Sequence, residues 1–425
     1  MCIRDRACLV TGITPQQALA EGVPESEFIA RIHDELARPG TCGVGYNSIR
    51  FDDEVTRYTL YRNFFDPYAR EWKSGNSRWD LIDVVRLAHA LRPEGIEWPT
   101  GDDGRPSFRL EKLTAANGIG HEAAHDALSD VEATIGMARL LRDRQPKLFD
   151  YALRLRDKQF VMSHLDLEQA KPVLHVSGMF GTDRHNIALV VPLARHPVNK
   201  NEIICFDLAS DPACLEELSA EALAERLFCA RGELPEGVER PGIKSIHINR
   251  SPIVVTPKLL DPATAERLGM DVEACRVHRS RLQAIPGLAA KLQAMYANRQ
   301  LPAITDPDRM LYSGGFFSDA DRRSMDRVRA ATPEELAAET FSFEDSRLPE
   351  MLFRYRARNY PDSLNDTERA QWEEHRFQAL TDPEAGASIT LDSFQAEIEQ
   401  LSQTATPEQQ VVLDALLEYG DGLLA

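Results

Sequence analysis

Apolar residues in the first third of the chain recur every three or four positions, which is typical of amphipathic helices. Such stretches cover 26–36 and 125–141. The inward face of the second helix is expected to consist of Ala127, Val131, Ile135 and Ala138. A further stretch, 79–91, has the same character, and Thr14 followed by Pro15 marks the start of a short helix near the beginning of the chain.

A short apolar strand is expected at 41–46, and the acidic segment 52–54 that follows it opens another helix. The Gly- and Pro-rich stretch 93–106 is typical of a surface loop. The helix after it should end at Asn117 and Gly118. Strand and helices together predict a small α/β domain that ends near Pro146.

The pattern changes after Asp157 and again near Leu301. Between these points, short β-rich runs are separated by Gly, Pro and Asn, at 173–176, 186–192, 203–206 and 245–248, with helical inserts at 215–229 and 262–268. This pattern predicts a small β-rich or barrel-like domain with few candidate catalytic groups. The remainder reads as helical to the end of the chain.

The composition of the 425 residues, 43% hydrophobic and 27% charged, is that of a soluble globular protein of two or three domains. Its apolar runs are too short to cross a bilayer, so we expect no membrane association and a cytoplasmic location. The seven cysteines show no zinc-ligand spacing, which fits reduced thiols. A net charge of −18 argues against indiscriminate coating of duplex nucleic acid, but a local basic groove stays compatible with it.

The segment from His125 to Asp130 carries the strongest candidate chemistry. Asp126 and Asp130 lie one helical turn apart, and His125 lies just before the first turn. An imidazole and a carboxylate at this spacing can serve as a base and a metal ligand. The alternative is that His125 and Asp126 cap the helix and that Asp130 is solvated.

A second acidic cluster, Asp52, Asp53 and Glu54, follows the 41–46 strand. α/β proteins keep their sites at such strand ends. Acids in a first helical turn also complement the helix dipole, so we expect one of the three, and not all, to take part in chemistry.

Cations and aromatic residues alternate along 50–78, and more briefly along 354–360. This suits single-stranded nucleic acid, because rings stack on bases while cations follow phosphates. Aromatic residues in a core and arginines paired with neighbouring acids would give the same composition, so both readings stay open.

Several of these segments closely resemble the bacterial exodeoxyribonuclease I family. The resemblance is carried by Gly45–Arg57, Ser77–Leu81, Pro106–Glu111 and His125–Asp130, and it continues through Val176–Gly181, Gly315–Asp321 and Tyr355–Asn359. It covers nearly the whole chain. It implies an α/β ribonuclease-H-like exonuclease domain (1–145), an SH3-like β-rich domain (146–299) and an all-helical C-terminal domain (302–425).

The resemblance implies a single-stranded-DNA-specific 3′→5′ exodeoxyribonuclease that releases 5′-mononucleotides by two-metal-ion hydrolysis, in DNA repair and recombination. Asp52 matches the second acidic motif and Asp130 the third, which makes both metal ligands and catalytic residues, and His125 matches the histidine that activates the attacking water. Arg109 matches a contact to DNA near the scissile end. Positions along the strand path are matched by Arg57, Tyr68 and Trp72.

The expected cofactor is a pair of Mg²⁺ ions, with Mn²⁺ as a possible substitute, because both prefer carboxylate oxygens. The expected partners are single-stranded DNA and the acidic tail of single-strand-binding protein, with Arg92 and Tyr151 at matching positions for that tail. We expect the chain to be a monomer.

The chain departs from the family at its start. The family's first motif is an Asp-x-Glu on the opening strand, upstream of a segment that matches Thr11–Pro15, and the ten residues before Thr11 contain no such pair. We therefore expect a truncated N-terminus, with Met1 to Arg6 foreign to the fold. The alternative function is a catalytically inactive module that binds single-stranded DNA or a protein.

Overall fold

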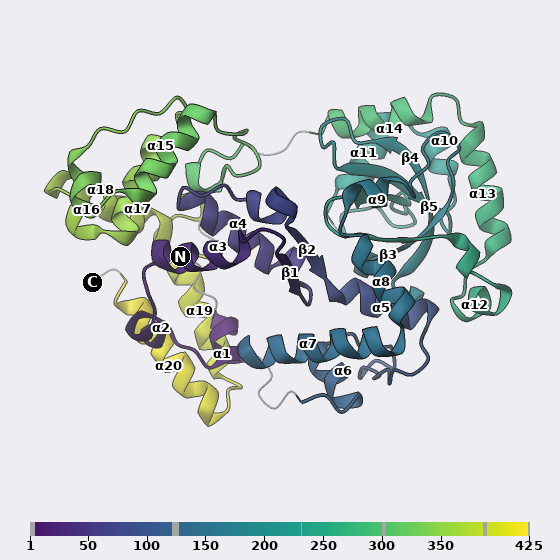
Figure 1. Ribbon diagram of the computed structural model, residues 1–425, viewed down its shortest axis with the longest axis horizontal. Helices are drawn as coiled ribbons and strands as arrows, with labels where there is room; N and C mark the ends of the chain where they lie inside the picture. The colour runs from purple at the N-terminus through teal and green to yellow at the C-terminus, as the bar shows by residue number, and fades with distance from the viewer. Residues whose placement is uncertain (1–4, 121–126, 231, 300–302, 386–388, 424–425) are drawn as a thin grey trace. The chain divides into compact units, whose positions relative to one another are not determined.

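The computed structural model of the chain describes residues 5–120, 127–230, 232–299, 303–385 and 389–423 (Figure 1). It divides into two compact units. The helical unit comprises 1–39, 52–74 and 303–425, and the sheet unit comprises 40–51 and 75–302. In the part of the chain that is described, no helix is both long and apolar enough to cross a membrane.

The helical unit combines helices from both ends of the chain. Its first helices are α1 (Asp5–Thr11), α2 (Pro15–Glu21), α3 (Glu25–Leu36) and α4 (Asp52–Arg62). The later ones are α15 (Asp319–Ala330), α16 (Pro333–Ala338), α17 (Leu348–Asn359), α18 (Asp366–Thr381), α19 (Leu391–Ser402) and α20 (Pro407–Asp421). The predicted cap of α2 is confirmed, because Gln17 N donates to Thr14 Oγ1 at 3.3 Å and Pro15 occupies the first helical position.

Two of the apolar cores of the helical unit join segments that are far apart in the sequence. One core joins α4 to the C-terminal helices and is formed by Tyr61, Phe64, Met325, Val328, Leu336, Met351 and Tyr355. The other lies between α19 and α20, with half-buried Cys8 and Leu9 of α1 packed against it. Residues at the two ends of the sequence therefore depend on each other for burial.

The sheet unit contains two sheets. In the first, β1 (Cys42–Gly45) pairs in parallel with β2 (Ser77–Asp80), and Gly45 lies opposite Asp80. The second is antiparallel with the strand order β6-β5-β4-β3-β7. Its strands are β3 (Val173–Val176), β4 (Ile187–Arg195), β5 (Glu202–Asp207), β6 (Ile243–His247) and β7 (Ile253–Val255).

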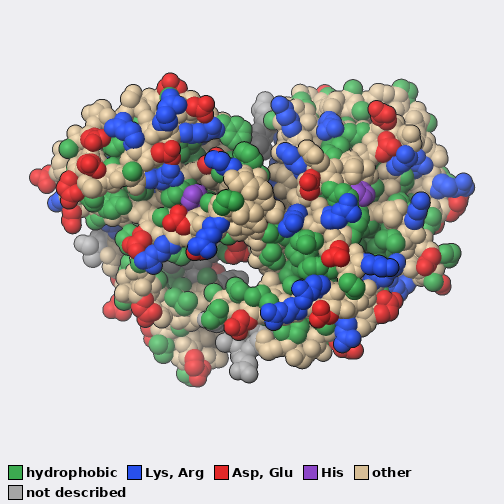
Figure 2. Space-filling model, in the orientation of Figure 1, with side chains coloured by type: hydrophobic (Ala, Val, Ile, Leu, Met, Phe, Trp, Pro, Cys, Tyr) green, Lys and Arg blue, Asp and Glu red, His purple; other side chains and the backbone are tan. Residues whose placement is uncertain are grey.

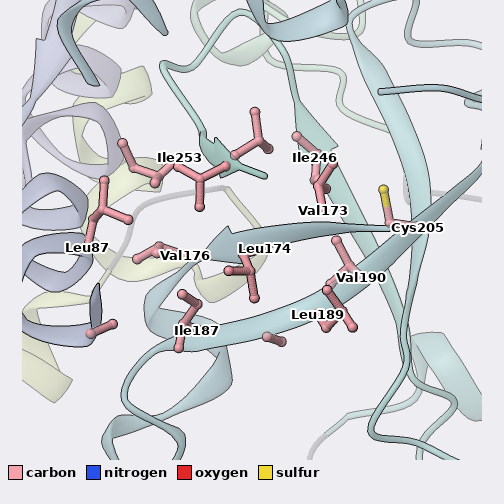
Figure 3. Packing of buried hydrophobic residues seen from close by; sticks show 14 of the residues in the cluster. Leu87, Val173, Leu174, Val176, Ile187, Leu189, Val190, Cys205, Ile246 and Ile253 are labelled. Atoms are coloured by element: carbon pink, nitrogen blue, oxygen red, sulfur yellow. The ribbon is translucent and has the colours of Figure 1, made fainter. Parts of the chain in front are cut away.

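The sheet unit also contains α-helices. They are α5 (Leu81–Leu91), α6 (Leu110–Ala116), α7 (Ala127–Arg144), α8 (Pro146–Arg154), α9 (Lys158–Met162), α10 (Ala213–Glu217), α11 (Ala220–Phe228), α12 (Pro262–Arg267), α13 (Val272–Ala284) and α14 (Leu288–Ala297). One continuous core runs through the unit, and Figure 3 shows Leu87 of α5 beside Val176 and Ile253 of the antiparallel sheet. Most of the apolar residues of α5 are buried in this core, while its half-buried Asp83 and Arg86 pair with each other at 2.7 Å.

The structure corrects three expectations about elements. Trp79 and Asp80 belong to β2 and not to the helix that follows, because Trp79 pairs with Val44 of β1 and its Nε1 donates to Ala152 O at 3.2 Å. The strand β7 and the helices α13 and α14 were not expected.

The third correction concerns α7. Val131 and Ile135 are exposed, and the buried face is instead formed by Ala133, Met137 and Leu141, which face α5 and α6. The helix carries two apolar stripes, and packing against α5 and α6 decides which of them is buried.

Candidate active site

The carboxyl ends of β1 and β2 position several residues of the sequence motifs. The Asp80 carboxylate accepts hydrogen bonds from Asn47 N (2.8 Å), Ile49 N (3.2 Å) and Ile82 N (3.0 Å). These bonds fix the turn after β1, where Asn47 adopts a left-handed conformation with φ of 61°. Burial raises the pKa of Asp80 while the three backbone bonds oppose that rise. Asp80 therefore shapes the backbone that leads from β1 to α4.

Arg109 lies at the same edge of the sheet unit. It is exposed and directly precedes α6, and the neighbouring Phe108 is buried with its carbonyl oxygen 2.6 Å from the Tyr46 hydroxyl that donates to it. Tyr46 follows β1, so this bond fixes the start of α6 beside the strand end. A cation at this edge is positioned for a ligand, as in other α/β proteins.

Asp52 begins α4 in the helical unit. Its two neighbours are engaged, because Asp53 Oδ1 accepts from Arg70 Nη2 at 2.8 Å and Glu54 pairs with Arg57 at 2.8 Å. The Asp52 side chain is exposed. Partial burial of its carboxyl, and then the charge of Asp53, raise its pKa. Of the three acids, Asp52 is thus the one available to a ligand from solvent.

Asp130 lies in the first turn of α7 and is half-buried. His125 and Asp126 lie outside the described residues, so the structure places neither of them. Asp52 belongs to the helical unit and Asp130 to the sheet unit. Among the described residues there is no group of three or more His, Cys, Asp or Glu at metal-binding distance. The carboxylate oxygens of Asp52 and Asp130 are nevertheless the donor type that Mg²⁺ and Mn²⁺ prefer.

Three predicted strand-path residues lie in the helical unit, in different environments. Trp72 is 67% exposed, Tyr68 is half-buried, and Arg57 is only 3% exposed. Arg57 Nε and Nη2 donate to the two carboxylate oxygens of Glu71 at 2.7 and 2.8 Å. The exposure of Trp72 agrees with the nucleic-acid reading of this segment, whereas the pairing of Arg57 is what the structural reading predicts.

The basic run of α17 is also engaged. Arg354 and Arg356 are buried, and they pair with Asp306 and Glu350 and with Glu368, respectively. Arg358 pairs with Asp308 at 2.7 Å. These pairs hold helices and loops of the helical unit together, which supports the structural reading of 354–360. Figure 2 shows the same intermingling of cationic and acidic side chains over the visible face.

Three family profiles match successive parts of the chain. They describe an exonuclease over residues 2–137, the exonuclease I SH3-like domain over 156–298 and the exonuclease I C-terminal domain over 305–423. The predicted fold class is therefore confirmed.

Curated and solved relatives agree with these profiles. The chain is 47% identical to the exodeoxyribonuclease I of Escherichia coli, over 98% of this chain and 87% of that protein, and 44% identical to that of Haemophilus influenzae over 98% and 88%. Among solved structures, an exonuclease I from Methylocaldum szegediense has a TM-score of 0.95 and 49% identity, covering 100% of this chain and 90% of the other. The E. coli exonuclease I in complex with a dA16 oligonucleotide has a TM-score of 0.93 and 46% identity, covering 100% and 89%.

The exonuclease, SH3-like and C-terminal profiles occur in the order that the sequence motifs predict, and the relatives match along nearly the whole chain. The chain belongs to the exodeoxyribonuclease I family and is a phosphodiester-hydrolysing exonuclease.

Proposed function

We propose that this exonuclease degrades single-stranded DNA from its 3′ end and releases 5′-mononucleotides. The observation that carries the proposal is the similarity, over the full length of this chain, to an exonuclease I solved with a dA16 oligonucleotide. Exposed Arg109 and exposed Trp72 supply a cation and a stacking surface of the kind that single strands require. We place this activity in the cytoplasm, in DNA repair and recombination.

Asp52 and Asp130 would hold the divalent cations, and Mg²⁺ in particular suits their oxygens. A bound pair of such ions would orient the attacking water and stabilise the attacking and leaving oxygens. His125 would accept the proton of that water near neutral pH. Arg109 would bind the phosphate next to the cleaved bond. Asp53, the neighbour of Asp52, is neutralised by its ion pair with Arg70, so it would not add a second negative charge that repels the strand.

The partner that we propose is the acidic tail of single-strand-binding protein, since one solved relative is a structure of SSB/exonuclease I in complex with an inhibitor. Arg92 is exposed, and the Tyr151 hydroxyl donates to Val254 O at 2.8 Å, so that the ring is fixed beside β7. Both residues lie in the sheet unit. We further propose that the chain acts as a monomer.

The test is digestion of a 5′-labelled single-stranded oligonucleotide with Mg²⁺, compared with Mg²⁺ plus excess chelator and with an Asp130→Ala variant. We expect a ladder that shortens from the 3′ end in the first reaction and an intact strand in the other two. An Arg142→Ala variant, altered at an exposed position near the other end of α7, should digest like the unchanged chain. Binding without digestion by a folded chain would contradict the proposed reaction and support the inactive binding module.

A further inference from the structure

Aromatic rings from two distant parts of the sequence, two of them exposed and one half-buried, lie side by side in the helical unit. The Tyr68 ring centroid is 6.5 Å from that of Tyr312 and 6.3 Å from that of Phe316. Phe316 is 84% exposed and Tyr312 is 52% exposed. Large rings left in water at one place mark a surface that contacts something else. We call Tyr68, Tyr312 and Phe316 the ring cluster.

The backbone near Phe316 is built to direct its ring outward. Arg347 is buried, and its guanidinium lies 4.4 Å from the Phe317 ring centroid and donates to Gly315 O at 3.2 Å. A Cβ atom on Gly314 would lie 1.9 Å from Arg347 Nη1, and Gly315 has a φ of +74°. Phe317 stacks on Tyr61 of the core with ring centroids 5.8 Å apart, whereas its neighbour Phe316 is exposed. The exposure of Phe316 is therefore a consequence of a fixed turn.

Arg57 contacts the other two rings of the ring cluster, Tyr312 and Tyr68. Besides its paired bonds to Glu71, Arg57 Nη1 donates to Glu54 at 2.8 Å and to the Tyr312 hydroxyl oxygen at 3.1 Å. The Tyr312 hydroxyl in turn donates to the second oxygen of Glu54. The guanidinium of Arg57 also lies 5.5 Å from the Tyr68 ring centroid. One buried cation thus contacts both rings and both acids.

The charge of this network is unsuited to a phosphate. Glu54 and Glu71 carry two negative charges and Arg57 one positive charge, while the nearby Asp53–Arg70 pair is neutral. To reach a phosphate, the Arg57 guanidinium would have to leave the carboxylates of Glu71 and Glu54, whose side chains are 9% and 28% exposed, which is costly for partly buried charges. Flat faces of nucleobases carry no such charge and stack on aromatic rings.

We infer that Tyr312 and Phe316 stack on nucleobases of the single strand together with Tyr68, and that Arg57 is a positioning residue that holds these rings. This inference rests on the proposed function and deepens it. It also changes the expected role of Arg57, which acts through Tyr68 and Tyr312. Binding at the ring cluster then depends on bases, whereas binding at Arg109 depends on phosphates.

The first test compares two oligonucleotides of equal length, oligo-dT and an abasic strand, by fluorescence anisotropy in the presence of chelator so that no cleavage occurs. Phe316→Ala and Tyr312→Ala should weaken binding of oligo-dT by roughly 5- to 150-fold, the range for loss of one base-stacking ring. Neither should change binding of the abasic strand. Phe377→Ala is the matched control, because Phe377 is an exposed ring on α18 of the same unit.

An equal loss on both strands, or no loss on oligo-dT, would overturn the stacking role. A chain that in its unchanged form binds neither strand would contradict the proposed function, and this inference with it. If the unchanged chain bound oligo-dT and the abasic strand equally well, only the inference would be contradicted.

The second test separates a positioning role of Arg57 from phosphate contact. Glu71→Gln removes a negative charge, so a purely electrostatic effect would tighten DNA binding. Loss of the paired hydrogen bonds to Arg57 should instead weaken oligo-dT binding about 5-fold or more, as expected for about 1 kcal/mol of lost stacking. The thermal midpoint of each variant shows whether it is folded.

Salt dependence gives an independent measure of the same role. The binding constant K falls as the salt concentration rises, and loss of one phosphate contact makes the plot of log K against log salt less steep by about 0.7 for a single strand. Arg57→Lys, which keeps the charge but not the paired geometry, and Glu71→Gln should leave this slope unchanged while affinity falls. Tighter binding by Glu71→Gln, or a smaller slope in an Arg57→Met variant that melts cooperatively, would overturn the positioning role.

Discussion

Burial and pairing divide the charged residues around α4 into two kinds. Asp53 and Arg70 form a buried pair, and Arg57 is enclosed by acids, whereas Asp52 keeps an exposed carboxylate. A buried ion is retained only when its partner is in place, because desolvation otherwise outweighs the attraction. The paired residues therefore maintain the shape of this part of the helical unit, and Asp52 is the acid that we propose as a cation ligand.

Breaking the Asp53–Arg70 pair should be costly for stability. Asp53→Ala leaves the buried Arg70 guanidinium without this carboxylate, and we expect a loss of about 3 kcal/mol or more in unfolding free energy. Denaturant unfolding followed by circular dichroism measures it. Glu27→Ala is the control, since Glu27 and Arg31 form an exposed i,i+4 pair on α3 and should show little change. Equal effects of the two substitutions would contradict the argument.

Buried histidine makes the sheet unit sensitive to acid. His175 on β3 is buried and its Nδ1 donates to Ile253 O at 2.8 Å; burial lowers its pKa to about 4, below the ordinary value near 6.5. Above pH 6.5 neither the folded nor the unfolded chain holds this proton. As the pH falls from 6.5 toward 4, only the unfolded chain takes it up, so up to about 3 kcal/mol of stability is lost.

We expect the thermal midpoint to fall between pH 7 and pH 5, and to fall less steeply in His175→Asn, whose side-chain amide can replace the Nδ1 donor. Some dependence should remain in the variant, because burial also lowers the pKa of His89 to about 4. Parallel pH profiles of the two chains would show that His175 does not take part.

At the scale of elements, the sequence predicted those helix caps and strands that depend on residues close together in the chain. The cap at Thr14 and the presence of β3, β4 and β5 were predictable, because each follows from neighbouring residues, although β4 runs on to Arg195 beyond its expected end at 192. The buried face of α7 was not, since two apolar stripes compete and only the contact with α5 and α6 selects one. Trp79 was assigned to a helix because its pairing with Val44 lies 35 positions away in the sequence. The ring cluster was missed for the same reason, as Tyr312 and Phe316 meet Tyr68 only after folding.

The turn from Met310 to Phe317 should depend on the absence of a side chain at Gly314. In Gly314→Ala the new Cβ would meet Arg347 Nη1, which donates to Met310 O at 3.3 Å, while Nη2 of the same guanidinium donates to Asp345 at 2.7 Å. We expect a loss of roughly 1–3 kcal/mol, as for other overpacked positions. Gly120→Ala is a control, because no atom of the described residues lies within 4 Å of the Cβ that it would add. An unchanged melting temperature for Gly314→Ala would mean that the turn relaxes without cost.

At the scale of the whole molecule, the net charge of −18 opposes the approach of DNA, so binding has to come from local groups. Candidates of two kinds are exposed: the cation Arg109 in the sheet unit, and aromatic rings such as Trp72 in the helical unit. Cations release counterions from the strand when they bind phosphate, whereas stacking rings do not. The two kinds should therefore differ in their response to salt.

We expect Arg109→Ala to weaken binding of single-stranded DNA and to lower the slope of log K against log salt by about 0.7, the contribution of one phosphate contact. Trp72→Ala should weaken binding as much or more while the slope stays unchanged. Arg142→Ala, at an exposed arginine of α7, is the charge-matched control and should change neither quantity. Titrations with chelator at several salt concentrations give both numbers. If Arg109→Ala and Arg142→Ala lowered the slope equally, the strand would be responding to the total charge of the chain, and the argument for a local phosphate contact at Arg109 would fail.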